Sequence, residues 1–437
     1  MRIAHVVRRL SFEDWGGTEQ TVWNLAKAQA KAGHETRIFA TTALCGKRQE
    51  TVDGIEIVRF KPIYPWWPMP KSLVDELDRK GGNPFVPGLG KALREWKPDV
   101  IHCHAMARIA ELCLRTAKGL KAQAGRQQAY DNKGGRPKHS NTRTLKPFSP
   151  VCVISLHGGG ANVPGAEAKS LKAPTRGRLP WGKAIDILMG WTRRVPEDFD
   201  GIVCVGEDEY EKYRTVHPHV MYLPNGVDCS LFKGRETRDD ERYAAGRPLR
   251  LLCVARIDRQ KNQMMLVEAL ARHPGMELCL AGPVTQPDYR AEIESRAAAL
   301  GVSSRVTFTG ALKPGSPELL GEFAKADVFA LASRHEPFGI AVLEAWAAGL
   351  PVAASGVGGL GRLCAAHPGA AEVFAPDDAA SLDAALAAIK ARLAADGARG
   401  MKEAGAAAAA EYDWAVLAER LGKFMESIPP GRAAESD

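Results

Sequence analysis

The sequence predicts an α/β protein with two Rossmann-like domains, each built on a mostly parallel sheet. Strand-like apolar runs alternate with helical patterns along the chain, as expected when crossover helices join parallel strands. The length of 437 residues exceeds what one hydrophobic core usually organises. Because ligands bind beyond the carboxyl ends of strands in open α/β sheets, we expect the two sheets to face each other across a cleft.

The strand-like runs fall into two series. The first series covers residues 3–7, 35–40, 55–60, 100–103, 151–156, 201–205 and 220–223. The second series covers residues 249–255, 277–280, 305–309, 328–331 and 352–354. Between them lie the turn at Asn225-Gly226 and a charged stretch at 233–247, where we place the hinge.

The composition is that of an ordinary globular protein, with 45% apolar and 25% charged residues. The first residues form no signal-peptide pattern, and the sequence contains no uninterrupted apolar run long enough for a membrane span, so we expect a cytoplasmic protein. The nine cysteines are an odd number without a C-x-x-C pair. This pattern predicts neither a disulfide framework nor a zinc site.

The positive charge is concentrated in one segment. The net charge is +8, and residues 118–183 hold 13 lysines and arginines against two acids, which gives 13 − 2 = +11. Residues 122–149 within it are polar and lack apolar periodicity, so we interpret them as a flexible insertion. The segment is either a solvated loop or a contact for an anionic acceptor or an anionic membrane surface. It lacks the interleaved aromatic residues expected for nucleic-acid binding, so we expect no nucleic-acid partner.

Two glutamates, Glu336 and Glu344, frame a helix start marked by proline and glycine. We expect Pro337 at the first helical position and Glu336 at the cap, which would separate the two glutamates by about 12 Å along the axis. A helix start of this kind attracts phosphate oxygens. The backbone amides that would bind them belong to Phe338, Gly339 and Ile340.

This glutamate pair resembles the signature of the family 4 retaining glycosyltransferases, which have the two-domain GT-B fold. Other motifs of the family follow in the expected order along the chain. They are the glycine loop Gly16-Gly17-Thr18-Glu19, the interdomain turn Pro224-Asn225-Gly226-Val227-Asp228, the basic pair Arg256 and Lys261, and the strand ends Leu280-Ala281-Gly282-Pro283 and Phe308-Thr309-Gly310.

The resemblance implies a domain plan and an activity. It implies an acceptor-binding domain at 1–228, a nucleotide-sugar donor domain at 229–411 and a helix at 412–428 that crosses back, before a disordered tail at 429–437. The implied reaction moves a hexose from a nucleotide-diphosphate sugar to an acceptor hydroxyl in cell-surface glycan or glycolipid synthesis. The implied acceptor is a glycan, a lipid-linked molecule or a small polyol, and the implied location is the cytoplasm or the inner membrane face.

The resemblance also assigns roles in the donor domain. Glu336 would contact the donor sugar, and Glu344 would accept hydrogen bonds from the ribose hydroxyls. Arg256 and Lys261 would stabilise the negative charge that grows on the leaving diphosphate. Gly282 would lie beside the donor. No Asp-x-Asp triplet stands in the setting of a metal site, so we expect neither a metal nor a cofactor beyond the donor substrate.

Four further positions belong to the first domain. Gly16 and Gly17 follow a strand, where their amides could face a phosphate or the acceptor. His157 ends a strand before three glycines and resembles the family's histidine that contacts the transferred sugar. His104 is a second candidate at a strand end. His102 and His104 share one strand face, and we do not expect them to chelate a metal.

One departure and three alternatives qualify this interpretation. After Ser355-Gly-Val-Gly-Gly359 the family commonly continues with proline and glutamate, whereas this chain has Leu360-Gly361-Arg362. A GT-B nucleotide-sugar epimerase would share the fold and the nucleotide contacts. A non-catalytic sugar-nucleotide or lipid-binding protein would lack turnover. A nicotinamide enzyme is disfavoured, because neither sheet opens with G-x-G-x-x-G.

Overall fold

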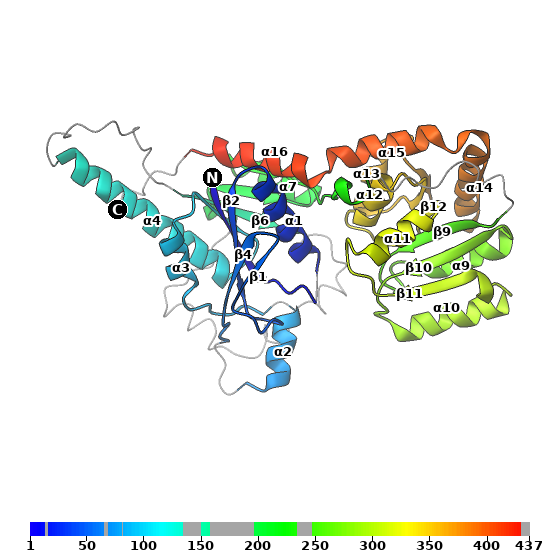
Figure 1. The fold of residues 1–437 in the computed structure, drawn as a ribbon, viewed down its shortest axis with the longest axis horizontal. Coiled ribbons are helices and arrows are strands. Elements are labelled where there is room, and N and C mark those ends of the chain that lie inside the picture. The colour runs from blue at the N-terminus through cyan, green and yellow to red at the C-terminus, as the bar shows by residue number, and fades with distance from the viewer. Residues whose placement is uncertain are drawn as a thin grey trace. The chain divides into compact units, whose positions relative to one another are not determined.

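The computed structural model describes residues 1–13, 16–64, 69–80, 82–133, 150–157, 196–233 and 247–429. The chain forms two compact units (Figure 1). The N-terminal unit comprises Met1–Pro224 and Leu417–Asp437, and the C-terminal unit comprises Asn225–Val416. Each unit contains a mostly parallel sheet with helices, so the predicted α/β class is confirmed.

The N-terminal unit is built on an eight-stranded sheet in the order β3-β4-β2-β1-β5-β6-β7-β8. All pairs are parallel except β3 with β4. The strands are β1 (Arg2–Arg9), β2 (Glu35–Thr41), β3 (Gln49–Val52), β4 (Ile55–Phe60), β5 (Val100–Cys103), β6 (Val151–Leu156), β7 (Gly201–Cys204) and β8 (Val220–Tyr222). The strand order reverses between β1 and β5, which is where doubly wound sheets bind ligands.

Helices cover both faces of this sheet, as expected for parallel strands buried on both sides. One apolar layer includes Trp23 and Ala26 of α1, and the opposite layer includes Leu93 of α3 and Ile109 of α4. The helices are α1 (Gly17–Lys31), α2 (Lys71–Lys80), α3 (Leu89–Trp96), α4 (Arg108–Lys133), α7 (Glu207–Tyr213) and the later part of α16 (Trp414–Ser427). Short turns η2 (Pro196–Asp198) and η3 (Cys229–Leu231) lie in the connections.

The C-terminal unit has a six-stranded parallel sheet in the order β11-β10-β9-β12-β13-β14. Numbered within the unit, this order is 3-2-1-4-5-6, the doubly wound arrangement whose switch point lies between the first and fourth strands. The strands are β9 (Leu249–Val254), β10 (Met276–Ala281), β11 (Val306–Gly310), β12 (Val328–Leu331), β13 (Val352–Ser355) and β14 (Glu372–Phe374).

Seven α-helices and two short turns, η3 and η4, belong wholly to the described part of this unit. The helices are α9 (Gln263–Arg272), α10 (Pro287–Ala299), α11 (Pro317–Lys325), α12 (Ile340–Ala347), α13 (Gly358–Ala366), α14 (Ala379–Asp396) and α15 (Arg399–Glu411), and η4 covers Ser303–Arg305. Trp346 of α12 is fully buried, and its indole N–H donates to the Ala370 carbonyl over 2.8 Å. This bond satisfies the polar atom of a large core side chain.

The structure corrects two sequence-based expectations and leaves others outside its described residues. Residues 122–133, which were expected to belong to a flexible insertion, instead continue α4 to Lys133 through a stretch rich in alanine and glutamine, which favour helix. Strands β3 and β14 were not predicted. Residues 134–149, much of the basic segment 118–183, and the tail after 429 lie outside the described residues.

The last helix, α16, packs against the N-terminal unit over its later part. A Cβ at Gly201 of β7 would lie 2.5 Å from Ile428 Cδ1 and 3.2 Å from Phe424. The absence of a side chain at Gly201 therefore lets these two residues pack closely against the strand. None of the helices within the described ranges combines the length and the apolar character that crossing a bilayer requires.

Candidate functional site

The first group of site residues lies at the switch point of the C-terminal unit. Lys261 follows β9, and Glu336 follows β12, its neighbour in the sheet. The Lys261 ammonium lies 2.6 Å from Glu336 Oε2, and each side chain is only 14% exposed. The structure therefore brings two of the predicted site residues into direct contact at the place where the fold binds ligands.

The turn after β9 is held by one buried aspartate. Asp258 Oδ1 accepts from the backbone N–H groups of Gln260 and Lys261, both over 3.1 Å. Its other oxygen lies 3.3 Å from the guanidinium of Arg256, whose side chain is 54% exposed. Asp258 thus fixes the backbone that carries Lys261, whereas Arg256 remains accessible to a ligand.

Gly282 has a steric reason to be glycine. It has a φ of +153° at the end of β10, and a Cβ there would lie 2.0 Å from the Ala255 carbonyl oxygen. Its N–H donates to Gly310 over 2.9 Å. The glycine therefore lets the connections after β9, β10 and β11 approach one another beside Arg256.

The helix start differs from the prediction. Helix α12 begins at Ile340 with Gly339 as its N-cap in the left-handed region, at a φ of +97°. Glu336 therefore precedes the helix, and the axial separation of about 12 Å from Glu344 does not apply. The predicted start is wrong because Gly339, rather than Pro337, sets the turn into the helix. The Val342 N–H donates to the Gly339 carbonyl over 2.9 Å, so the amides of α12 that remain without a partner inside the helix are those of Ile340 and Ala341.

Glu344 lies in the second turn of α12 and is half-buried. Burial raises the pKa of its carboxyl from 4.5 to about 7. A carboxyl in this position is ready to accept hydroxyl donors, because hydrogen bonds to its charged form offset the cost of burial. The side chain of Phe338 packs edge-on against Tyr412, with ring centroids 5.9 Å apart.

The unusual Leu360-Gly361-Arg362 sequence has a packing role. A Cβ at Gly339 would lie 2.8 Å from Leu360 Cδ1, so Leu360 covers the start of α12. The N–H of Gly359 donates to the Glu336 carbonyl over 3.0 Å, and a Cβ at Gly359 would lie 1.8 Å from the Pro337 oxygen. The glycine turn thereby supports the backbone that presents Glu336.

A second group of predicted residues lines a pocket in the N-terminal unit. Gly16, Gly17 and His104 lie there with Arg8 and Arg9, at the carboxyl ends of β1 and β5. The pocket has a volume of about 430 Å³. Its position matches the switch point of this sheet, and its glycine loop opens the 15-residue helix α1.

The two arginines of the pocket have different partners. Arg9 pairs with Glu19 of α1 over 2.7 Å. Arg8 donates to the Asp78 carbonyl over 2.7 Å, and burial together with the nearby Arg9 lowers the pKa of its guanidinium. These arginines were not singled out from the sequence, although they form the carboxyl end of the otherwise buried strand β1.

His157 and His104 belong to one chain of hydrogen bonds. His157 Nε2 lies 3.0 Å from His104 Nδ1, and His104 Nε2 lies 3.0 Å from His5 Nδ1. His5 Nε2 lies 2.7 Å from Gln29 Oε1 on α1. Burial lowers the pKa values of His5 and His157 to about 4, so these imidazoles are neutral at pH 7.

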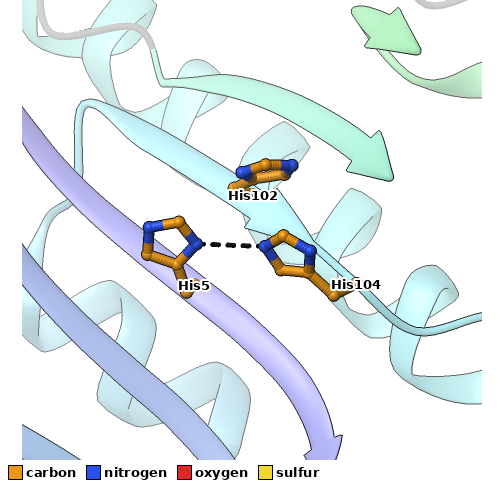
Figure 2. Close-up of side chains that lie close together, drawn as sticks. All are labelled: His5, His102 and His104. Atoms are coloured by element: carbon orange, nitrogen blue, oxygen red, sulfur yellow. Dashed lines mark hydrogen bonds between the residues drawn. The ribbon is translucent and has the colours of Figure 1, made fainter. Parts of the chain in front are cut away.

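His102 and His104, which were not expected to chelate a metal together, lie close to each other in the structure. The rings of His102 and His104 have centroids 3.9 Å apart, and His5 of the neighbouring strand lies beside both (Figure 2). His5 was not singled out from the sequence, although its strand pairs with that of His102. The Asp198-Phe199-Asp200 triplet is structural, because Asp200 bonds Lys121 and the Cys152 N–H.

Comparisons with known proteins match both halves of the chain. Residues 16–226 match the model described as Glycosyl transferase 4-like domain, and residues 235–426 match Glycosyl transferases group 1. The D-inositol 3-phosphate glycosyltransferase of Mycolicibacterium paratuberculosis is 33% identical over 244 residues, 51% of each chain. The match thus spans about half the length of that curated relative.

Two solved structures share the fold over nearly the whole chain. Sucrose-phosphate synthase from Thermosynechococcus elongatus has a TM-score of 0.61 and 21% identity, covering 97% of this chain and 98% of its own. HepE from Anabaena, in complex with UDP-glucose, has a TM-score of 0.57 and 17% identity, covering 98% and 100%. With consecutive family models on its two halves, the chain belongs to the GT-B glycosyltransferases of family 4.

Proposed function

We propose that the protein is a retaining glycosyltransferase that moves a hexose from a nucleotide-diphosphate sugar to an acceptor hydroxyl. The observation that carries this proposal is the Lys261–Glu336 pair at the switch point of the C-terminal sheet. A cation and a carboxylate held side by side suit a substrate that has a diphosphate next to a polyhydroxylated ring.

The charge changes of the reaction explain the basic residues. As the bond between the sugar and the diphosphate breaks, negative charge grows on the diphosphate oxygens. Lys261 and the exposed Arg256 stabilise that charge more strongly in the transition state than in the ground state. These two cations take the place of a divalent metal at the diphosphate, so donor binding and transfer require no added metal ion.

The carboxylates position the donor. Glu336 has lone pairs left beyond its bond to Lys261, and these accept hydrogen bonds from sugar hydroxyls. Glu344 accepts from the ribose hydroxyls, and the first amides of α12 bind the diphosphate. In the retaining reaction, the acceptor oxygen bonds the anomeric carbon on the face that the diphosphate leaves. The leaving diphosphate takes the hydroxyl proton.

The pocket of the N-terminal unit is the proposed acceptor site. Its glycine loop and Arg8 offer hydrogen-bond donors, which suit a hydroxylated or anionic acceptor. The relative from Mycolicibacterium is named for D-inositol 3-phosphate, a phosphorylated polyol, and we propose this acceptor class for the first assays. A lipid-linked glycan acceptor at the inner membrane face, used in cell-surface glycan synthesis, is the alternative that the basic segment 118–183 favours.

A turnover assay tests the proposal. The protein is incubated with UDP-, ADP- and GDP-sugars, with and without phosphorylated polyols and lipid-linked glycans, in the presence of a chelator. Nucleotide release that depends on acceptor, with a product whose anomeric proton keeps the donor configuration by NMR, supports the proposal. Conversion of the donor without any acceptor would instead identify an epimerase, and an inverted product would contradict the retaining mechanism.

A further inference from the structure

Three buried histidines lie together on one face of the sheet of the N-terminal unit (Figure 2). His5 of β1 is the register partner of His102 of β5, and His104 directly follows β5. One ring nitrogen from each lies within 4.8 Å of the others. Exposure is 0% for His5 and His102 and 6% for His104. Polar groups buried this deeply are costly unless each finds a partner.

The hydrogen bonds around the cluster leave one nitrogen unpaired. Each histidine bonds a residue outside the cluster through one ring nitrogen. These bonds join His5 Nε2 to Gln29 Oε1 at 2.7 Å, His102 Nε2 to Ser155 Oγ at 2.6 Å, and His104 Nδ1 to His157 Nε2 at 3.0 Å. His102 Nδ1 is buried and has no hydrogen-bond partner among the described residues.

We propose that His5, His102 and His104 bind a divalent transition-metal ion with the ligand preferences of zinc. The ligand atoms are the ring nitrogens that do not bond a residue outside the cluster. They are Nδ1 of His5, Nδ1 of His102 and Nε2 of His104. Histidines that bind metals almost always donate their other ring N–H to a neighbouring acceptor. All three histidines of this cluster have such a neighbour in place.

The ring geometry fits a tetrahedral ion at two of the three separations. With Zn–N bonds of 2.0–2.1 Å, two imidazoles on a tetrahedral ion have centroids about 5.2 Å apart. The ring centroid of His5 lies 5.3 Å from the ring centroid of His102 and 5.3 Å from that of His104. The pair His102 and His104 is closer, at 3.9 Å, so binding requires these two rings to separate by roughly 1 Å.

The chemistry of the cluster selects the class of metal. The three proposed ligand atoms are all imidazole nitrogens. A nitrogen-only ligand set suits zinc, cobalt, nickel or copper, whereas magnesium and calcium prefer oxygen. The positive charge of the nearby Arg8 repels cations, which disfavours an ion that the histidines bind only weakly. His104 lines the pocket, so a water molecule can take the fourth position.

The ion would hold β1 to β5 and orient His104 against His157. It belongs to the N-terminal unit, whereas the proposed diphosphate contacts lie in the C-terminal unit. The site is therefore independent of the metal-free donor chemistry, and failure of one proposal leaves the other standing.

Cobalt titration of the full-length, untagged chain tests the site. The protein is treated with a chelator, dialysed and titrated with Co²⁺ while visible absorption is recorded, and bound Zn²⁺ is measured in parallel by elemental analysis. We expect one ion per chain and the visible bands of four- or five-coordinate Co²⁺. The near-ultraviolet band of a cobalt–thiolate bond should be absent despite the nine cysteines.

Variants locate the ion. His102→Gln should abolish stoichiometric binding, and Ser155→Ala, which removes only an outer partner, should weaken it about 10- to 100-fold. His217→Gln is the control, because His217 lies in the same unit but bonds the backbone carbonyls of Phe199 and His219. If His102→Gln does not fold, Ser155→Ala carries the test.

Two outcomes would overturn the proposal. The first is no stoichiometric binding to the wild-type chain, and the second is equal binding by wild type, the His102 variant and the Ser155 variant. Either result would reduce the cluster to a chain of hydrogen-bonded neutral imidazoles without a metal.

Discussion

Lys261 is the single residue on which the proposed chemistry depends most. Replacing it with alanine removes a cation from the diphosphate and leaves Glu336 unpaired at 14% exposure. We expect Lys261→Ala to lower turnover about 100- to 1,000-fold, the usual effect of removing one donor that stabilises a transition-state charge. Steady-state kinetics with a saturating acceptor measure this loss.

Arg259→Ala is the matched control for Lys261. Arg259 lies in the same turn, but its guanidinium pairs with exposed Asp288 and Glu292. We expect its turnover to stay within about threefold of wild type, because exposed ion pairs contribute little. Equal losses in the two variants would assign the effect to disruption of the turn rather than to the charge of Lys261.

Glu344 makes stability depend on pH. Its folded pKa of about 7 lies above the ordinary 4.5, so the stability present below pH 4.5 is lost as pH rises through 7. Glu344→Gln removes this loss. We expect the variant to match wild type at pH 4 and to exceed it by about 1–3 kcal/mol at pH 8 in urea unfolding.

A control separates this effect from general changes in charge. Glu411 is exposed on α15, so Glu411→Gln should show no comparable pH-dependent gain. A stability difference for Glu344→Gln that stays constant from pH 4 to pH 8 would show that the Glu344 carboxyl is not destabilised by burial.

At the scale of elements, the start of α12 depends on Gly339. Alanine there would have to adopt a φ of +97° and would push against Leu360. We expect Gly339→Ala to destabilise the protein by about 1–3 kcal/mol and to weaken donor binding, because the turn that presents Glu336 would shift. Thermal unfolding and nucleotide titration measure the two effects.

Gly321→Ala provides the comparison within the same unit. Gly321 lies inside α11, and an added Cβ would meet no atom within 4 Å. We expect this variant to be as stable as wild type or up to about 1 kcal/mol more stable. Equal stability of Gly339→Ala and wild type would contradict the account of the helix start.

The strands were predictable because buried parallel strands give continuous apolar runs. All four residues of β12 are buried, and the sequence predicts it with the correct limits. Strand β3 was missed because three of its four residues are polar and all four are at least partly exposed. Strand β14 was missed because Glu372 and the exposed Val373 leave only Phe374 buried. A buried strand leaves a run of apolar residues in the sequence, whereas these two exposed edge strands leave no such run.

The candidate site was only partly predictable. Motif order indicated Lys261 and Glu336 but not their contact, which depends on two neighbouring strands ending together. The start of α12 was predicted wrongly because the sequence does not show that Gly339 adopts a positive φ. The histidine cluster was missed because His5 lies far from His102 in the chain and meets it only through strand register.

At the scale of the whole molecule, the uneven charge predicts a membrane effect. The net charge of +8 is concentrated in residues 118–183, although much of that segment lies outside the described residues. We expect the protein to sediment with liposomes that contain anionic lipid, and the binding to fall as salt rises. Replacing Arg136, Lys138, Arg143 and Lys146 with glutamine should weaken this binding.

The same variant separates the two interpretations of the segment. Nucleotide binding should be unchanged, because the proposed donor contacts lie in the other unit. Unchanged liposome binding by the glutamine variant would favour a plain solvated loop. Neutral liposomes serve as the control for binding that does not depend on charge.

Donor binding tests the central claim most directly. Calorimetric titration with UDP-, GDP- and ADP-sugars, in the presence of a chelator, compares wild type with Lys261→Ala and Glu344→Ala. The account predicts that one nucleotide series binds wild type without metal and that both variants bind it at least tenfold more weakly. Folded wild-type protein that binds none of the three series, or binds only after a divalent metal is added, would contradict the proposed donor site.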